Sequence, residues 1–337
     1  MCGIVGYVGN KKATPILING LLCLEYRGYD SAGIATIEKD KIKAVKNQGR
    51  VKNLYNLNDI NKLEGTIGIA HTRWATHGKP SKENAHPHLD NSNTFAVVHN
   101  GIIENYHKLR EFLISKGYTF VSETDTEVIP NLIHYYFNNG IRTHENRFLS
   151  AVKSAVDVLK GSYAVLAISS LFPDEIIVAR KDSPLVIGSS KDAKYIASDI
   201  PAILNYSKNF YLLDDNELAI IHKDSIHFFD SSLTEHNKVL KNIEWDNCSA
   251  QKDGFEDFMI KEIFEQPKAV RETIGARLVL GGKCNFEDLS ISKETLSKIN
   301  KIYIVACGTA MHAGLVRKGT YRKAMSNTSR SWHSIRI

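Results

Sequence analysis

Strand-like and helix-like segments follow one another in blocks along this chain, and this order constrains the fold more than any other feature. Up to Gly161, apolar strand-like segments alternate with segments of helical periodicity. After Gly161, nearly every segment is short, rich in β-branched and aromatic residues, and bounded by turn residues. Such blocks are typical of sheets packed on sheets and covered by helices. We therefore predict an α+β layered domain that ends near residue 235.

The individual elements follow from the same periodicities. Helices are predicted at residues 14–26, 105–116, 126–139 and 147–160. A glycine follows each of the last three, as is typical of a helix end. Pro130 weakens the third helix unless that helix begins late or kinks there. The predicted strands are residues 2–8, 33–37, 42–45, 66–72, 94–99, 163–169, 175–179, 185–189, 195–197, 210–213, 217–222 and 225–229.

The chain changes character after the layered domain. Residues 236–290 are polar, helical at 257–277, and predicted to form a linker. Residues 301–310 resemble the first strand of an α/β domain, followed by a Gly-Thr turn and a helix start. Such a turn often directs backbone N–H groups at a phosphate, although a single turn is weak evidence. Because a parallel sheet needs several crossover units, we expect this second domain, residues 291–316, to be incomplete.

The formal net charge of +6 comes entirely from the end of the sequence. Residues 317–337 contain six Lys or Arg residues and no acidic residue, so the preceding part is formally neutral. The charge is therefore no evidence that the folded body binds nucleic acid. Because this basic tail is also Ser-rich and aperiodic, we hypothesise a truncation or a reading-frame change near residue 316.

Cysteine usage and hydropathy bear on the compartment. The five cysteines, at positions 2, 23, 248, 284 and 307, form no Cys-x-x-Cys pair, which argues against a zinc site. A scattered, odd set without an export signal suits reduced thiols in the cytoplasm. No apolar run approaches the ~20 residues of a membrane span. We expect a cytoplasmic protein with neither nucleic acid nor a membrane as partner.

Cys2 is the first residue of the first predicted strand. If Met1 is removed, one residue carries both a thiol nucleophile and a free α-amine. Such an amine titrates near ~8, so it can accept the thiol proton at neutral pH without a histidine. The competing interpretation is a small buried apolar residue, and Cys2 alone does not decide between the two.

Two further segments lie at the ends of predicted strands. Arg73, in His-Thr-Arg-Trp-Ala-Thr-His-Gly at residues 71–78, could clamp a carboxylate through two parallel hydrogen bonds. The polar run that follows, residues 79–88, is predicted to be a surface loop and a candidate lid. The Asn100 amide and the Gly101 N–H could together stabilise an oxyanion. Each segment also has a simpler interpretation. Taken alone, the arginine is compatible with an ordinary solvated loop, and the Asn-Gly pair is compatible with a tight turn.

The segment Ser-Glu-Thr-Asp-Thr-Glu at residues 122–127 offers an acidic group. Thr124 and Glu127 fit a capping box, which leaves Asp125 free to pair with an ammonium group. Residues 25–33 contain Gly28 and Gly33 and predict a close backbone turn, without a chemical role of their own.

Together these groups specify a substrate. A thiol requires an acyl carbon, an arginine a carboxylate, an aspartate an ammonium group, and a pair of N–H donors an oxyanion. An amino acid with a side-chain amide satisfies all four, and glutamine is the natural candidate.

The same segments resemble the class II glutamine amidotransferases. The matching segments are Cys-Gly-Ile-Val-Gly at 2–6, Tyr-Arg-Gly-Tyr-Asp-Ser-Ala-Gly at 26–33, the Arg73 segment, Val-His-Asn-Gly at 98–101 and Glu-Thr-Asp-Thr-Glu at 123–127. The resemblance covers residues 1 to about 316. It implies the N-terminal-nucleophile hydrolase fold, a four-layer αββα sandwich, with residues 1–235 as the glutaminase domain.

The resemblance also implies a role for each matching residue. Cys2 is the nucleophile with its own amine as base, and Asn100 and Gly101 form the oxyanion hole. Arg73 binds the glutamine α-carboxylate, with Thr76 and His77 nearby, and Asp125 binds the α-ammonium. Trp74 belongs to the loop that closes over glutamine. No metal or redox cofactor is implied.

Two later segments narrow the resemblance. Met-Ile-Lys-Glu-Ile-Phe-Glu-Gln-Pro at 259–267 and Ala-Cys-Gly-Thr at 306–309 are similar to family members that pass ammonia through a channel to fructose 6-phosphate, the first step of hexosamine synthesis. In those members Cys307, Gly308 and Thr309 open the sugar-phosphate site. These segments argue against the member that aminates phosphoribosyl pyrophosphate.

The sequence departs from the family after Val316. This sequence lacks the phosphate loop, the isomerase lysine and histidine, and most of the dimer-forming surface of the full-length family. The full-length family is dimeric, whereas this chain could be a monomer. We expect glutamate and ammonia from the chain alone, without glucosamine 6-phosphate. The non-enzymatic alternative is a truncated product whose basic tail binds acidic partners.

Overall fold

The computed structural model describes residues 2–243, 255, 258–275, 278–279, 283–284, 292–299, 304–306 and 310–316. The chain divides into two compact units, Met1–Lys261 and Glu262–Ile337. The predicted domain boundaries at 235, 290 and 316 stay predictions, although strand pairing in the first unit continues to Asn242.

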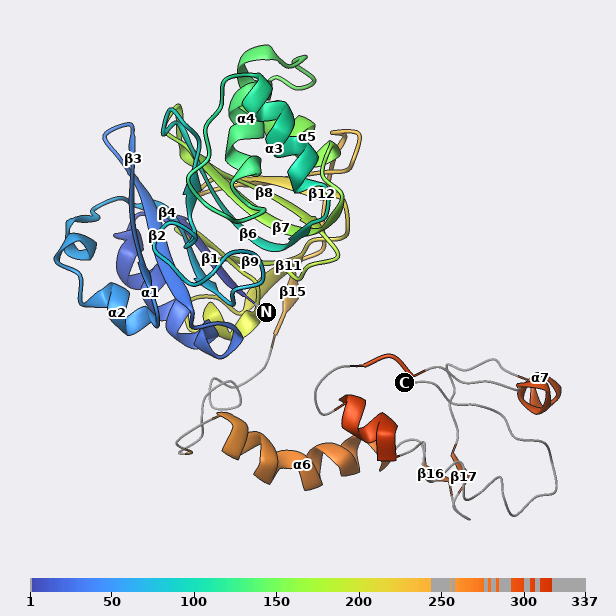
Figure 1. Cartoon of the computed structure of the whole chain (residues 1–337). Helices are drawn as coiled ribbons and strands as arrows, with labels where there is room; N and C mark the ends of the chain where they lie inside the picture. Colours follow the sequence, from blue (N-terminus) through green and yellow to red (C-terminus); the bar gives the residue numbers. More distant parts are fainter. Residues whose placement is uncertain are drawn as a thin grey trace. The chain divides into compact units, whose positions relative to one another are not determined.

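Two antiparallel sheets form the first unit (Figure 1). In spatial order, the first contains β15 (Lys241–Asn242), β11 (Asn209–Leu212), β9 (Val186–Ser189), β10 (Ala193–Ala197), β1 (Gly3–Gly9), β4 (Ile67–Arg73), β2 (Ser31–Glu38) and β3 (Lys41–Gln48). The second contains β14 (Glu235–His236), β13 (Ile226–Phe229), β12 (Glu217–Ile221), β8 (Phe172–Lys181), β7 (Gly161–Ser169), β6 (Phe95–Ile103) and β5 (His88–Leu89).

Helices cover the outer face of each sheet (Figure 1). The first sheet is covered by α1 (Ala13–Leu24), α2 (Val51–Tyr55) and the short 3-10 helices η1 (Glu25–Arg27), η2 (Asn58–Lys62) and η3 (Ile200–Ala202). The second is covered by α3 (Tyr106–Ser115), α4 (Val128–Asn139) and α5 (Arg147–Asp157). The layers are therefore helix, sheet, sheet and helix.

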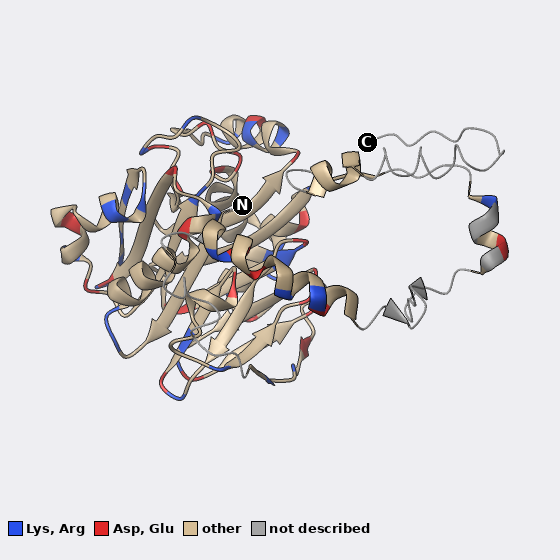
Figure 2. Ribbon diagram, turned by 90° about the horizontal axis from the view of Figure 1, so that it is seen from below, with Lys and Arg blue, Asp and Glu red and all other residues tan. Residues whose placement is uncertain are grey.

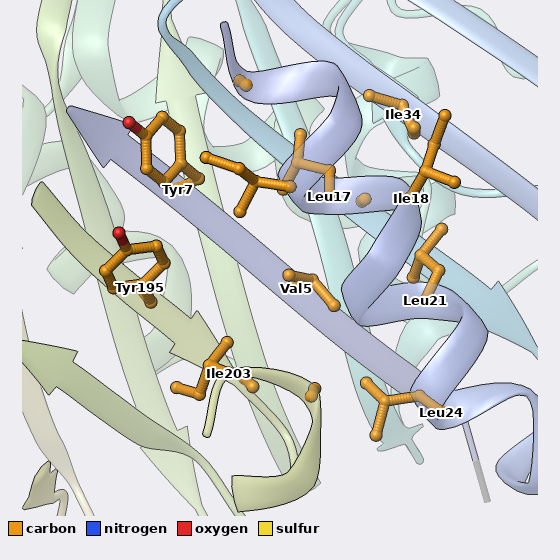
Figure 3. Close-up of a cluster of buried hydrophobic side chains, with 14 of the residues drawn as sticks. Val5, Tyr7, Leu17, Ile18, Leu21, Leu24, Ile34, Tyr195 and Ile203 are labelled. Carbon is orange, nitrogen blue, oxygen red and sulfur yellow. The ribbon is translucent and has the colours of Figure 1, made fainter. Parts of the chain in front are cut away.

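Three apolar cores fill the three spaces between these layers. In β1, Val5 and Tyr7 point toward α1, where they meet Leu17 and other buried residues (Figure 3). The alternate residues of β1, among them Ile4, belong to the core between the sheets. Because side chains alternate across a strand, a strand buried on both faces reads as a continuous apolar run. This explains why β1 is apolar throughout, and the third core lies between the second sheet and α3–α5.

The strands and helices predicted before residue 235 are all present. Pro130 is in the first turn of α4, which begins at Val128, where a missing N–H removes no helical hydrogen bond. Gly117 follows α3 with a φ of +91°. The patterns did not predict α2, which is five residues long, or β5, which is two.

The predicted surface loop at residues 79–88 is wrong in its second half. Asn84, His86 and His88 are only 2–4% exposed. The Lys46 ammonium donates to the backbone oxygens of Ala85 (2.8 Å), Glu83 (3.2 Å) and Pro87 (3.3 Å). These interactions hold a polar segment inward, where its carbonyls need partners.

Few elements are described after residue 243. Helix α6 (Phe258–Gly275) confirms the helix predicted at 257–277 and contains Pro267. Strands β16 (Leu278–Val279) and β17 (Lys283–Cys284) pair, α7 is Lys293–Lys298, and residues 310–316 are helical. In the segment 301–310, predicted to be a strand followed by a turn and a helix start, the described residues 304–306 are not in a strand. No helix among the described residues is long and apolar enough to span a bilayer. Basic and acidic residues are interspersed along the described ribbon (Figure 2).

Candidate active site

Cys2 precedes β1, which lies between β10 and β4 in the centre of its sheet. Gly3 pairs with Thr72 of β4, so Cys2 lies beside the end of that strand. Its Sγ accepts a hydrogen bond from the Trp74 N–H (3.3 Å) and lies 3.5 Å from the Trp74 carbonyl oxygen. Burial raises the pKa of the Cys2 thiol, whereas the Trp74 N–H and the Arg73 charge act in the opposite direction. The site thus holds a partly buried thiol against a strand end.

The turn at residues 26–33 supports this strand end. A Cβ atom at Gly28 would lie 2.6 Å from both the Arg73 carbonyl carbon and the Trp74 nitrogen. The Thr72 hydroxyl donates to the Gly28 carbonyl oxygen at 2.5 Å. The Asp30 carboxylate accepts from the Ala75 N–H at 2.8 Å. The predicted close backbone turn therefore packs against the residues that follow β4.

Arg73 ends β4 and is 4% exposed. Its Nη2 donates to the His77 carbonyl oxygen and, at 3.0 Å, to the Gly78 carbonyl oxygen. Its Nη1 is buried without a partner among the described residues. Burial lowers the pKa of the guanidinium. An unpartnered buried donor on a forked cation is suited to binding a carboxylate.

Asn100 and Gly101 come from the opposite sheet. Both lie inside β6, where they pair with Ala164 and Tyr163, so the tight-turn interpretation is wrong. Gly101 has a φ of +135°, which allows the strand to continue to Ile103. The Asn100 Nδ2 donates to the Cys2 carbonyl oxygen at 3.1 Å. This amide therefore lies beside the thiol-bearing residue.

Asp125 lies on the segment before α4 and is 5% exposed. Its Oδ2 accepts from the Ile103 N–H at 2.8 Å, and its negative charge acts on both Cys2 and Arg73. The predicted capping box is absent, because the Glu127 carboxylate accepts from the N–H groups of Ser122 (2.7 Å) and Val121 (2.9 Å).

The remaining predicted residues lie at the rim. Trp74 is 45% exposed, with its ring edge-on to Tyr29 and the two ring centroids 5.7 Å apart. Thr76 is exposed, and His77 packs edge-on against Tyr106 with a buried Nδ1 that has no partner among the described residues. Trp74 and Thr76 are therefore at the surface of this structure.

The predicted sugar-phosphate residues Cys307, Gly308 and Thr309 lie outside the described residues. Within the described ranges, no group of three His, Cys, Asp or Glu side chains could hold a metal ion. One residue that touches the site was missed: His71 Nε2 lies 3.0 Å from Asn100 Oδ1. The only sequence signal was its position two residues before Arg73 on an apolar strand.

Comparison with known proteins places this geometry in a family. The family model of the glutamine amidotransferase domain matches residues 71–205. The glutamine–fructose-6-phosphate aminotransferase (isomerising) of Clostridium acetobutylicum is 51% identical over 323 residues, which are 96% of this chain and 52% of that protein. Residues 71–205 of this chain belong to the glutamine amidotransferase domain family.

Other members agree with this assignment. The corresponding aminotransferase of Caldanaerobacter subterraneus is 52% identical over 318 residues, which are 94% of this chain and 51% of that protein. The chain thus spans about half the length of the curated relatives it matches. The glutamine phosphoribosylpyrophosphate amidotransferase of B. subtilis, solved with ADP and GMP, has a TM-score of 0.59 at 29% identity, and the match covers 69% of this chain and 50% of that one. The predicted N-terminal-nucleophile hydrolase fold of this amidotransferase domain is confirmed.

Proposed function

We propose that this chain releases ammonia from L-glutamine, with Cys2 as the nucleophile. The observation that carries the proposal is the arrangement around Cys2. Its thiol lies beside a buried arginine whose Nη1 has no partner in the part of the chain that the structure describes. The thiol is also within electrostatic range of Asp125, and the Cys2 carbonyl accepts from Asn100. These are the groups that an amino acid with a side-chain amide requires.

The chemistry proceeds in two stages. Once Met1 is removed, the Cys2 amine takes the thiol proton and the sulfur attacks the amide carbon. The oxyanion is stabilised by Asn100 Nδ2 and the Gly101 N–H. The proton then passes to the leaving nitrogen, the C–N bond breaks, and ammonia departs. Water hydrolyses the thioester to glutamate and restores the thiol.

Substrate orientation depends on the two charged residues. In this proposal Arg73 binds the α-carboxylate and Asp125 the α-ammonium, with Thr76 and His77 beside the carboxylate. Trp74, which is exposed in the structure, packs over bound glutamine. The pair fixes both ends of the amino acid, so the amide carbon is presented to Cys2.

The acceptor of the ammonia follows from the relatives. Identity to the fructose 6-phosphate enzymes is 51%, against 29% for the phosphoribosylpyrophosphate enzyme, which favours fructose 6-phosphate and hexosamine synthesis. Because the chain matches 52% of the relative's length, we expect the 337-residue chain alone to form glutamate and ammonia. Incubation with glutamine and fructose 6-phosphate tests this, and formation of amino sugar would refute it. We place the reaction in the cytoplasm.

The decisive test is ammonia release from the purified chain, with intact mass used to verify removal of Met1. Cys2→Ala should abolish release, because alanine carries no nucleophile. Cys23→Ala is the matched control, since Cys23 is a partly buried free cysteine in α1. It should retain wild-type release. Equal release from Cys2→Ala and wild type would overturn the mechanism.

A further inference from the structure

Four histidines form a buried cluster behind the candidate active site. His71 comes from β4, His86 from the segment before β5, His88 from β5 and His99 from β6. Each is at most 4% exposed. The rings of His71 and His86 stack with centroids 4.0 Å apart. Because these side chains are shielded from solvent, any role they have must act through their contacts with neighbouring groups.

Within this histidine cluster, the contacts of the His71 ring fix its tautomer. Its Nε2 lies 3.0 Å from the backbone oxygen of His99 and 3.0 Å from the side-chain amide of Asn100. A backbone carbonyl only accepts, so Nε2 must carry the hydrogen. The Asn100 atom that shares this hydrogen must then be the oxygen, Oδ1. The amide nitrogen, Nδ2, is consequently the atom that faces Cys2.

We propose that His71 is a positioning residue whose Nε2–H holds the Asn100 amide with its nitrogen toward Cys2. The inference rests on the proposed function, in which that nitrogen stabilises the oxyanion. A reversed amide would present an oxygen lone pair to the developing negative charge and repel it. The hydrogen bond from His71 therefore acts together with the Cys2 carbonyl, which accepts from Nδ2 at 3.1 Å, to favour the productive one of two nearly isosteric amide orientations.

The surroundings of His71 keep its imidazole neutral and hold its ring in a fixed orientation. Burial lowers the pKa of His71 to about 3. Its Nδ1 is buried and has no partner among the described residues, so a second proton there would be an unsatisfied donor. The stacked His86 ring holds the plane of the imidazole. The single N–H of His71 is thus available to Asn100 throughout the neutral pH range.

Kinetics separate positioning from a general effect on folding. In His71→Phe the donor is lost, and we expect kcat for ammonia release to fall roughly 10- to 100-fold, less than the full loss of an oxyanion donor. The KM for glutamine should change less than about 3-fold, since the contact matters only in the transition state. His71→Gln keeps an N–H donor and should recover most of kcat. A His71→Gln variant as slow as His71→Phe would contradict the proposal.

A double-mutant cycle supplies the control for coupling. In the Asn100→Ala background, His71→Phe should reduce kcat no further, because the amide that it positions is absent. His88→Phe also removes a buried imidazole, one that contacts the Thr124 hydroxyl and not the Asn100 amide, and should reduce kcat much less. The inference is overturned if His71→Phe has the same effect in both backgrounds, or if His88→Phe is as slow.

A measurement on the wild-type chain avoids any variant that fails to fold. Nitrogen-15 NMR of the histidine rings should show His71 as the neutral tautomer with the proton on Nε2. A proton on Nδ1 would refute the inference. Failure of the proposed function is distinct: it appears as equal ammonia release from wild type and Cys2→Ala, whatever the tautomer of His71.

Discussion

Gly101 shows how a single residue can set the geometry of the candidate site. It lies within β6 with a φ of +135°, a backbone conformation that residues other than glycine rarely adopt. A Cβ atom there would lie 2.0 Å from the Ser162 carbonyl oxygen and 2.9 Å from His99 Nε2. The absence of a side chain thus allows β6 to pair with β7 in this conformation, with Asn100 beside Cys2.

Replacing Gly101 with alanine should therefore damage both stability and activity. Gly117→Ala is the matched control, because Gly117 has a φ of +91° and a Cβ atom there would meet no heavy atom within 4 Å. The control should lose only the left-handed backbone term, about 1–2 kcal/mol. Gly101→Ala must also displace backbone, so its free energy of unfolding in urea should fall further and ammonia release should be lost. Equal losses in the two variants would contradict the steric argument.

At the residue scale, the sequence predicted the polar groups but not their contacts. The geometry places Cys2, Arg73, Asp125 and Asn100 together as expected, while their roles stay predictions. His71 could not be found, because its tautomer depends on a carbonyl from another strand. Local motifs indicated the identity of the reacting groups, and tertiary packing supplied the groups that orient them.

At the scale of elements, α1 shows what amphipathic periodicity can predict. The helix packs its apolar side onto β1 and β2, as Figure 3 shows. Leu21 is fully buried in this contact, whereas the adjacent Leu22 is 43% exposed. The two residues differ in burial while sharing a helix, a side chain and a propensity.

This pair allows a matched test of the packing. Leu21→Ala should lower the free energy of unfolding by about 2–5 kcal/mol, because it removes buried apolar area and leaves a cavity. Leu22→Ala should change it by less than about 0.5 kcal/mol. Urea denaturation followed by circular dichroism measures both. If the two variants are equally stable, α1 does not pack as described.

Elements could be predicted where a periodic pattern extended over many residues. They could not be predicted where a short motif was compatible with two different local structures. The longer strands of both sheets were found from apolar runs, whereas the two-residue strands β5, β14 and β15 were not, and the strand order was not predicted because pairing is non-local. The Asn100-Gly101 turn and the Thr124–Glu127 capping box both failed. In each case another contact, with Ala164 on a different strand or with the Val121 N–H, replaced the expected one.

At the scale of the whole molecule, the histidine cluster links stability to pH. It lies where β4, β5 and β6 approach one another, and composition alone gives no indication of it. Burial lowers the pKa of all four histidines, to about 3 for His71. In the unfolded chain a histidine titrates near ~6.5, so only the unfolded state takes up these protons in mildly acidic solution.

The sign of the effect follows directly. A histidine whose folded pKa is lowered stabilises the fold above ~6.5, and that stability is lost as the pH falls toward the folded pKa. Each of the three histidines with strongly lowered pKa values, His71, His86 and His88, contributes a slope that approaches about 1.4 kcal/mol per pH unit, so together they approach about 4 kcal/mol per pH unit near pH 5. Carboxylates titrate mainly below this window. The free energy of unfolding in urea should therefore fall steeply between about pH 6.5 and 5, and His88→Gln should reduce the slope by about one third. A flat profile would show that protons reach these histidines in the folded state. In that case His71 would not be shielded by burial, and the argument that it stays neutral would be wrong.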